Sequence, residues 1–398
     1  MIYYKYKVQH TELNKMDLIN HKNALEKLNT WLTILIEAEG ADLHIKSNSK
    51  IRARVKDDIV LLSNEIVTAE MIESLVEAMT GDAYEDFKKT KEFDGAYGFS
   101  NHYRFRVNIY IHLDGLAIAL RMIPPHIKTI EELNLPKALH KLSDLRRGLV
   151  LITGTTGTGK TTTLASIIEE INLSKHYHII TIEDPIEYIH KDVNCIVEQR
   201  QVGIHTNSFS RALRAAMRED PDVIIVGEIR DIATAESILQ AVNTGHLVFS
   251  TLHTIDARET IDRLIAMYPT EEQNRVRSTL AATVEAIISQ RLIKGQDDQM
   301  YPAVEMMFKS PLIKELIRTK RDNEIPDAIV KEGISFDSIS FNQSLFDLTL
   351  EGKITEEQAY QYASSPSDLK LMFTMSSEYE KKYKSRKIGA VHSLKRER

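Results

Sequence analysis

The run Gly154-Thr155-Thr156-Gly157-Thr158-Gly159-Lys160-Thr161 has the residue types and the spacing of a phosphate-binding loop. It matches the pattern G-x-x-x-x-G-K-[ST] at every fixed position. Glycines let the backbone curl so that successive N–H groups point at an anion, and the lysine adds positive charge beside the β- and γ-phosphates. The hydroxyl of Thr161 can ligate Mg²⁺. Thr162, the next residue, is a further candidate for nucleotide binding. The pattern therefore predicts nucleotide binding.

A carboxylate that could act on water ends the buried run DVIIVGE at residues 222–228. Ligands of open α/β sheets bind at the carboxyl ends of the strands, and this is where Glu228 would lie. Gly227 replaces the metal-associated Asp that usually ends such a strand, so Glu228 is the candidate for polarising the attacking water. An ordinary ion pair with Arg230 or Arg218 is the alternative.

Three more carboxylates, Glu183, Asp184 and Glu187, follow the apolar run at 178–182 in the sequence TIEDPIE. Acidic groups beside a phosphate site repel one another and the nucleotide unless a cation intervenes. Mg²⁺ supplies that cation, and Thr161, Glu183 and Asp184 are its candidate ligands, directly or through water. A solvated acidic turn is the alternative.

Two histidines, His246 and His253, flank the apolar run at 247–251. Both are expected near the ends of that strand rather than on its interior. The sequence leaves a functional role and a structural role equally open for them. No third ligand is close in sequence, which disfavours a metal site.

The elements that must position these residues form two patterns. Strands are expected at 148–153, 178–182, 223–226 and 247–251, each separated by a helix-length segment, and a helix begins at Lys160. This alternation predicts a parallel sheet covered by helices on both faces. Residues 24–123 instead predict a small α+β unit. The predicted organisation is thus an extension (1–23), the α+β unit (24–123), a linker (124–136), an α/β domain (137–310), a helical segment (311–375) and a basic tail (376–398).

Composition excludes several classes of protein. The 398 residues contain no run of 18 apolar residues, and the N-terminus lacks the apolar region of a secretory signal. A single cysteine, Cys195, excludes an internal disulfide and a four-cysteine zinc site, so a reducing cytoplasm is expected. Residues 378–398 carry a net charge of +5 and the remaining chain −11. An acidic body argues against nucleic-acid binding, and the tail is either a solvated end or a contact for anionic lipid or an acidic partner.

Four segments, GTTGTGKTTT, TIEDPIEY, REDPDVIIVGEIRD and TGHLVFSTLHT, resemble in order and spacing the Walker A, Asp, atypical Walker B and His boxes of secretion ATPases. More narrowly, the chain resembles the type IV pilus retraction ATPases of the PilT and PilU type from about Leu25 to Phe373. ADLHIKSNSKIRARV, RFRVN at 104–108 and LPKALHKLSDLRRGLVLITG add to this resemblance. Residues 1–23 and the tail after Met375 have no counterpart in it.

The resemblance implies a homo-hexameric, ATP-hydrolysing motor with a PAS-like N-terminal domain and a RecA-like ATPase domain. It implies that Lys160 and Thr161 bind phosphates and Mg²⁺, and that Glu228 activates water. Glu183 and Glu187 would organise metal and water, and His246 and His253 would sense the nucleotide state. Its partners would be an inner-membrane platform protein and, as a further candidate, a paralogous retraction ATPase, with peripheral membrane association only, at the cytoplasmic face of the inner membrane.

The resemblance also implies that arginines of the N-terminal domain reach the nucleotide of another subunit. The matching positions are Arg104, Arg106 and Arg121, and an exposed strand face is the alternative reading of the first two. PLIKELIR at 311–318 partly resembles the AIRNLIRE motif of the PilT type, and ASSPSDLKLMF at 363–373 is closer to the PilU type. Primary and accessory retraction motors therefore both stay open.

Three rival functions remain at this point. A pilus-assembly or type II secretion ATPase is the nearest, but those proteins usually carry a four-cysteine zinc module that this chain lacks. A nucleotide-gated scaffold or regulator with little hydrolysis is the second, and intact Lys160, Thr161 and Glu228 argue against it. A DNA-translocating RecA-like ATPase is the third, and the acidic body disfavours it.

Overall fold

A computed structural model describes residues 15–56, 58–100 and 103–376 of the chain, which divides into two compact units, Met1–His126 and Ile127–Arg398. The predicted basic tail lies outside the described residues from 377 onward, and so do residues 1–14 of the predicted extension. None of the described helices combines the length and the apolar character needed to cross a bilayer.

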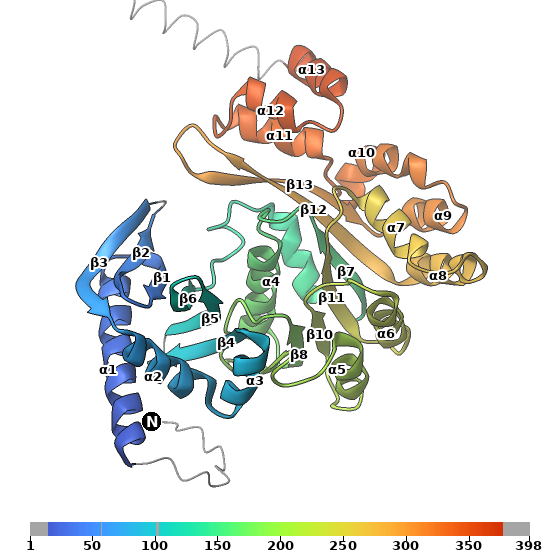
Figure 1. Cartoon of the computed structure of the whole chain (residues 1–398). Helices are drawn as coiled ribbons and strands as arrows, with labels where there is room; N and C mark the ends of the chain where they lie inside the picture. Colours follow the sequence, from blue (N-terminus) through green and yellow to red (C-terminus); the bar gives the residue numbers. More distant parts are fainter. Residues whose placement is uncertain (1–14, 57, 101–102, 377–398) are drawn as a thin grey trace, which may run out of the picture. The chain divides into compact units, whose positions relative to one another are not determined.

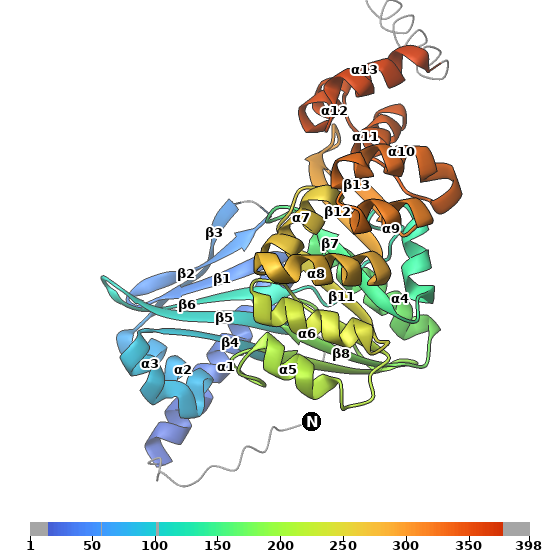
Figure 2. The same ribbon diagram turned by 90° about the vertical axis from the view of Figure 1, so that its right-hand side faces the viewer.

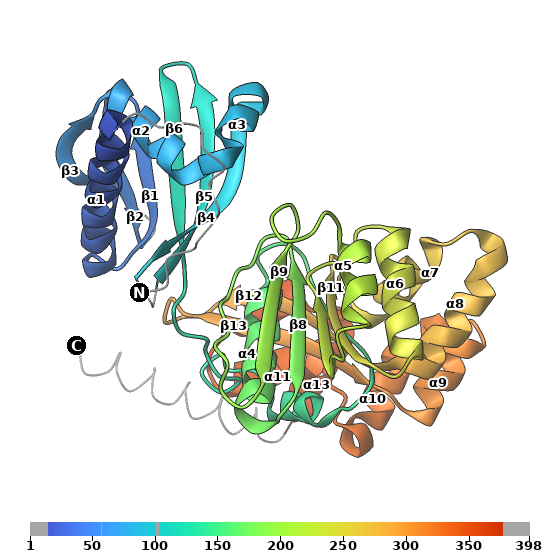
Figure 3. The same cartoon turned by 90° about the horizontal axis from the view of Figure 1, so that it is seen from below.

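The first unit is a six-stranded antiparallel sheet with the order β3-β2-β1-β6-β5-β4, against which helices pack (Figures 1 and 3). Its elements are α1 (Lys15–Glu37), β1 (Gly40–Lys46), β2 (Ser49–Val55), β3 (Asp58–Val67), α2 (Ala69–Thr80), the 3₁₀ turn η1 (Gly81–Ala83), α3 (Tyr84–Thr90), β4 (Glu92–Phe99), β5 (Tyr103–His112) and β6 (Gly115–Ile123). The α+β class predicted for this part of the chain is the class observed. That it is PAS-like stays a prediction.

The sequence predicts an extension over residues 1–23. In the structure helix α1 already begins at Lys15, so residues 15–23 belong to this helix. The apolar periodicity of this stretch is weak, but a contact with another helix stabilises it. His21 Nε2 lies 2.9 Å from Glu77 Oε2 on α2. Further along α1, Leu28, Trp31 and Leu32 are buried in the core of the unit. Packing of this kind stabilises helical residues that local sequence alone would leave undecided.

The second unit is built on a seven-stranded sheet with the order β13-β12-β7-β11-β10-β8-β9. All neighbouring strands are parallel except the antiparallel pair β12 and β13. Its strands are β7 (Gly148–Thr153), β8 (His178–Glu183), β9 (Ile196–Gln201), β10 (Val223–Val226), β11 (Leu247–Leu252), β12 (Val284–Lys294) and β13 (Met300–Phe308). The four predicted strands are present, whereas β9, β12 and β13 were not predicted. The sequences of β9 and β12 contain several polar residues, and β13 contains a proline and a glutamate.

Helices cover both faces of this sheet, as the continuous apolar strands predict (Figure 2). Leu149 and Leu151 of β7 belong to the core on one face, and Val150 and Ile152 to the core on the other. The helical elements are the 3₁₀ segment η2 (Lys137–Asp144), α4 (Lys160–Ser174), α5 (Phe209–Ala216), α6 (Ile232–Asn243), α7 (Ala257–Ala266), α8 (Thr270–Thr283), α9 (Pro311–Arg318), η3 (Asp322–Glu324), α10 (Ile325–Phe336), α11 (Phe341–Leu350), α12 (Glu356–Tyr362) and α13 (Pro366–Met375). The fold is thus an α/β core with a smaller α+β N-terminal unit and a helical C-terminal segment.

The predicted linker at 124–136 is divided between the two units. Ile130 and Leu135 are buried in the second unit, in the core that also contains Leu139 and Leu142 of η2. Ser166 of α4 donates its hydroxyl to the carbonyl of Lys128. Residues 127–136 therefore form part of the second unit and pack against the helix that follows the glycine-rich loop.

Candidate nucleotide-binding site

The glycine-rich loop connects the end of β7 to the start of α4, the strand–turn–helix context that its pattern requires. Gly154 has φ +144°, and a Cβ at this position would lie 2.6 Å from the carbonyl oxygen of Gln290 on β12. No larger residue fits this close approach. Gly159 takes the left-handed conformation immediately before the helix. The loop therefore presents its backbone at the amino end of α4, where anions bind.

Lys160 is buried at the base of this loop. Its Nζ donates to the carbonyl oxygens of Gly154, at 2.8 Å, and Thr155, at 3.0 Å. Burial lowers the pKa of this ammonium group, and the negative charges of Glu228 and Glu187 partly offset the effect. The positive charge is thus held within the loop by acceptors that belong to the loop itself.

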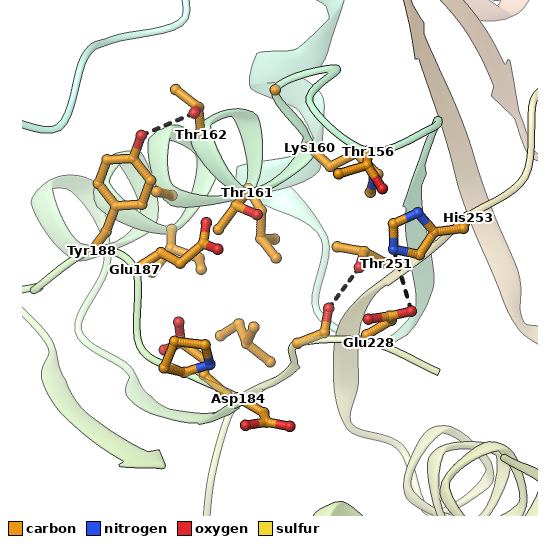
Figure 4. Close-up of a pocket in the computed structure, with 18 of the residues that line it drawn as sticks. Thr156, Lys160, Thr161, Thr162, Asp184, Glu187, Tyr188, Glu228, Thr251 and His253 are labelled. Atoms are coloured by element: carbon orange, nitrogen blue, oxygen red, sulfur yellow. Dashed lines mark hydrogen bonds and ion pairs between the residues drawn. The ribbon is translucent and has the colours of Figure 1, made fainter. Parts of the chain in front are cut away.

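A pocket of about 620 Å³ opens beside the loop, within the size range of small-ligand sites (Figure 4). It is lined by residues from the loop and α4 and from the carboxyl ends of β8, β10 and β11. Among the predicted site residues, those lining it are Thr156, Gly157, Gly159, Lys160, Thr161, Thr162, Glu183, Asp184, Glu187, Glu228 and His253. Gly154, Thr155 and Thr158 belong to the same loop but do not line the pocket wall. The parallel sheet therefore brings the glycine-rich loop and the segments that follow β8, β10 and β11 to one edge.

The carboxylate of Glu228, after β10, is held from two sides. Its Oε2 accepts a hydrogen bond from Nε of Arg230 at 2.9 Å, and its Oε1 lies 3.3 Å from Nε2 of His253. The hydrogen bond to Glu228 raises the pKa of Arg230. The ion pair with Arg230, considered above as an alternative to a functional role, is present, and it occurs inside the pocket. An ion pair and a position facing the ligand site therefore coexist.

The acidic residues after β8 have different surroundings. Glu183 accepts hydrogen bonds from the hydroxyl of Thr181 at 2.6 Å and from Nε2 of Gln199 at 3.2 Å. Burial raises the pKa of its carboxyl group, and these two hydrogen bonds act against the rise. Asp184 is exposed and pairs with Nη1 of Arg230 at 3.3 Å. Glu187 is exposed within the pocket lining.

The two histidines lie at opposite ends of β11. His253 lines the pocket, and Thr251 before it donates its hydroxyl to the carbonyl oxygen of Gly227 at 2.6 Å. His246 precedes the strand, and its carbonyl accepts from the amide of Gly148 at the start of β7. The glycine-rich loop follows the other end of β7. The structure therefore does not bring His246 to the pocket, because a strand of six residues, about 20 Å, separates it from His253.

The predicted Mg²⁺ ligands do not form a protein-only cluster. Among the residues that the structure describes, no group of three or more His, Cys, Asp or Glu side chains could hold a metal ion. Of the predicted set, Thr161 presents its hydroxyl on the pocket wall. Glu183 is engaged by Thr181 and Gln199, and Asp184 by Arg230. A Mg²⁺ ion bound mainly through nucleotide phosphates and water needs only one or two protein ligands, which this arrangement can supply.

The three predicted arginines belong to the first unit. Arg106 of β5 lies directly opposite Arg121 of β6 in the antiparallel register, and Arg104 lies opposite Ile123. Arg106 and Arg121 are exposed. Nε of Arg121 donates to Oδ1 of Asp42 on β1 at 2.7 Å, an ion pair that the sequence analysis did not foresee.

Tyr188, His190, Phe209 and Arg230 are among the lining residues that the sequence did not identify as site residues. Tyr188 and His190 continue the segment that carries Glu183 and Glu187, so their nearness to those carboxylates was a usable signal. Arg230 was considered only as a partner of Glu228. Phe209 begins α5 and carried no signal in the sequence.

The family description "Type II/IV secretion system protein" matches residues 19–320 of the chain. This range covers most of both units, including every predicted site residue. The chain belongs to the type II/IV secretion system protein family.

Two curated relatives are similar to the chain over nearly their whole length. The chain is 39% identical over 341 residues to the "Type IV pilus retractation ATPase PilT" of Pseudomonas aeruginosa, covering 85% of this chain and 99% of that protein. It is 36% identical over 349 residues to the "Type IV pilus ATPase PilU" of the same organism, covering 87% and 91%. A crystal structure of the pilus retraction motor PilT with bound ADP has a TM-score of 0.79 at 37% identity and covers 85% and 97%.

These similarities bear out the resemblance seen in the four boxes. The chain is a secretion-type ATPase of the type II/IV secretion system protein family, and the pocket beside its glycine-rich loop lies at the carboxyl edge of the parallel sheet.

Proposed function

We propose that this protein is an ATP-hydrolysing motor that drives retraction of type IV pili and thereby twitching motility. The observation that carries the proposal is the meeting of Lys160, Thr161 and Glu228 in one pocket of a chain that is similar to PilT over 85% of its length. Primary and accessory retraction motors both remain within the proposal.

Each pocket residue has a role in this proposal. Backbone N–H groups of residues 154–159, with Lys160 and Thr161, bind the phosphates. Glu228 orients and polarises the attacking water. Its two oxygens face Arg230 and His253, and each oxygen keeps a further lone pair for a water proton. Hydrolysis of this kind depends mainly on positioning and electrostatics.

Mg²⁺ fits the chemistry of the pocket, whose hydroxyl and carboxylate oxygens are the ligands this ion prefers. When bound it would offset the negative charge of the phosphates. Thr161 would hold it directly, and Glu183, Asp184 or Glu187 would do so directly or through water. His253 would report the nucleotide state through its contact with Glu228.

The proposed assembly is a homo-hexameric ring at the cytoplasmic face of the inner membrane, acting on a platform protein of the pilus machinery. A paralogous retraction ATPase is a further candidate partner. Arg104, Arg106 and Arg121 would reach the nucleotide across a subunit boundary. Family membership and the exposed position of Arg106 and Arg121 support these points.

Deletion of the gene in the source organism tests the function. Excess surface pili with loss of twitching is expected for a primary retraction motor, and normal piliation with altered motility or force for an accessory one. Loss of pili would contradict retraction and indicate an assembly ATPase. Purified protein must also release phosphate from ATP, and a chain that binds ATP without turnover would be a scaffold or regulator.

A further inference from the structure

The side-chain amide of Gln199 makes three hydrogen bonds to one short segment, 183–190, which carries several of the pocket-lining residues. Gln199 lies on β9, directly opposite Thr181 of β8 in the parallel register. Its Nε2 donates to Oε1 of Glu183 at 3.2 Å and to the carbonyl oxygen of Tyr188 at 2.8 Å. Its Oε1 accepts the backbone N–H of His190 at 2.9 Å. One side chain thus contacts the beginning, the middle and the end of the segment 183–190.

The hydrogen-bond partners allow only one orientation of this amide. The nitrogen faces two acceptors, a carboxylate and a carbonyl, and the oxygen faces a donor. In the flipped orientation the amide oxygen would face both acceptors, and two favourable contacts would become repulsive. A side chain that matches three partners at once restrains the segment more strongly than a single hydrogen bond would.

The same segment is also attached to α4, the helix that begins with Lys160. Nδ1 of the buried His190 lies 2.8 Å from Oε2 of Glu169. The hydroxyls of Tyr188 and Thr162 lie 2.9 Å apart. The segment that carries Glu183 and Glu187 is therefore fastened to the phosphate-binding helix on one side and to Gln199 on the other.

We propose that Gln199 is a positioning residue for ATP hydrolysis, which fixes where Glu183 and Glu187 stand relative to the phosphate-binding loop. The proposal rests on the ATPase function proposed above. Gln199 acts on the reaction through this segment and not by direct contact with nucleotide or with the attacking water. A displacement of about 1 Å in a catalytic segment can cost roughly 10²-fold in rate, so loss of this restraint should be visible in turnover.

The test compares Gln199→Met with wild type in the full-length protein. Methionine keeps the length and approximate volume of the side chain but forms none of the three hydrogen bonds. We expect kcat for phosphate release to fall about 10- to 100-fold. The dissociation constant for ATP should change less than about threefold, because Lys160 bonds to Gly154 and Thr155 rather than to this segment. If Gln199 only supported the fold, its loss would not lower kcat while leaving the dissociation constant for ATP nearly unchanged.

Gln358→Met is the matched control. Gln358 also bonds through both ends of its amide, accepting from the N–H of Thr355 at 2.9 Å and donating to the carbonyl of Lys294 at 2.7 Å. It lies on α12 and contacts no residue that lines the pocket through these two bonds. This variant should keep the wild-type kcat, and thermal unfolding of both variants shows whether they lose comparable stability.

If Gln199→Met does not fold, Gln199→Glu replaces it. That side chain has nearly the same shape and keeps the acceptor for His190, but places a carboxylate against Glu183. It should lower kcat at least as far. Unchanged kcat in a folded Gln199 variant, an equal loss in Gln358→Met, or a loss confined to ATP affinity would each overturn the inference. A wild-type protein without ATPase activity would instead overturn the proposed function.

Discussion

Glu228 shows how an ion pair and a catalytic position can coincide. Arg230 and His253 hold its two oxygens in place. A carboxylate that is held in this way loses little further freedom when it accepts a hydrogen bond from water. Such fixed placement is the basis of electrostatic preorganisation.

Glu228→Gln is therefore expected to retain ATP binding and to lower turnover by about 10²–10⁴-fold, the range for removing a group that polarises water. Equilibrium ATP binding and phosphate release at saturating ATP measure the two quantities. Glu315→Gln is a suitable control, because Glu315 pairs with Arg318 on α9 and does not line the pocket. Turnover close to wild type in Glu228→Gln would assign the role to Glu183 or Glu187 instead.

Lys160→Ala should abolish tight ATP binding and leave the fold intact. Within the described part of the chain, the hydrogen bonds of its Nζ go to carbonyl oxygens of its own loop. Its removal therefore deletes one phosphate-facing charge without breaking a contact between elements. Calorimetric titration with ATP measures the affinity, and far-ultraviolet circular dichroism checks the fold. Wild-type affinity in a folded variant would contradict the assignment of the phosphate-binding loop.

At the scale of elements, the loop after β11 is fastened to the sheet by a buried carboxyl group. Glu305 of β13 accepts the N–H of Ala257, at the start of α7, at 2.9 Å. Burial raises the pKa of Glu305 to about 7, and Asp256 adds to the rise. The unfolded chain would ionise this group near pH 4.5. Its contribution to stability is thus complete below pH 4.5 and is lost as pH rises through about 7.

Glu305→Gln keeps the acceptor for Ala257 but cannot ionise. The free energy of unfolding of this variant, relative to wild type, should therefore increase between pH 5 and pH 8, by at most about 1.4 kcal/mol per pH unit. Denaturant unfolding of both proteins at pH 5, 6, 7 and 8 gives the difference. Subtracting the two curves removes the titration of all other groups. A difference that stays constant with pH would show that the folded state does not raise the pKa of Glu305.

At the scale of the whole molecule, the arginines and the pocket belong to different units. Under the proposed function, Arg106 and Arg121 supply charge to the nucleotide of a neighbouring subunit. Their loss should lower turnover of the assembled protein by about 10³–10⁵-fold, the range for an arginine finger. Phosphate release by Arg106→Gln and Arg121→Gln measures this effect.

The ion pair of Arg121 with Asp42 requires its own control. Asp42→Asn breaks the pair and keeps the arginine, so it should retain activity if the guanidinium acts on nucleotide. An equal loss in Asp42→Asn would make Arg121 a strand-packing residue. Mixing provides the second check: Arg121→Gln subunits should partly complement Glu228→Gln subunits if the arginine acts across the boundary. If subunits are shown to exchange and mixing still restores no ATPase activity, Arg121 does not act on the nucleotide of a neighbouring subunit.

Local patterns in the sequence were sufficient for the core of the second unit. The strands at 148–153 and 223–226 are continuous apolar runs, because both faces of a parallel sheet are buried. The glycine-rich loop is contiguous in sequence, and its conformation depends on residues that are neighbours along the chain. A short motif of this kind can therefore be recognised without knowledge of the tertiary structure.

Only the tertiary structure decided which distant residues meet. The hydrogen bond from Gln199 to Glu183 depends on the parallel register of β8 and β9. The sequence did not predict β9, because four of its six residues are polar. His246 and His253 look equivalent in sequence, yet strand direction puts one at the pocket and the other at the far edge. The contact of His21 on α1 with Glu77 on α2 likewise joins residues 56 positions apart in the chain. Register, strand direction and packing join residues far apart in the chain, so local sequence does not determine them.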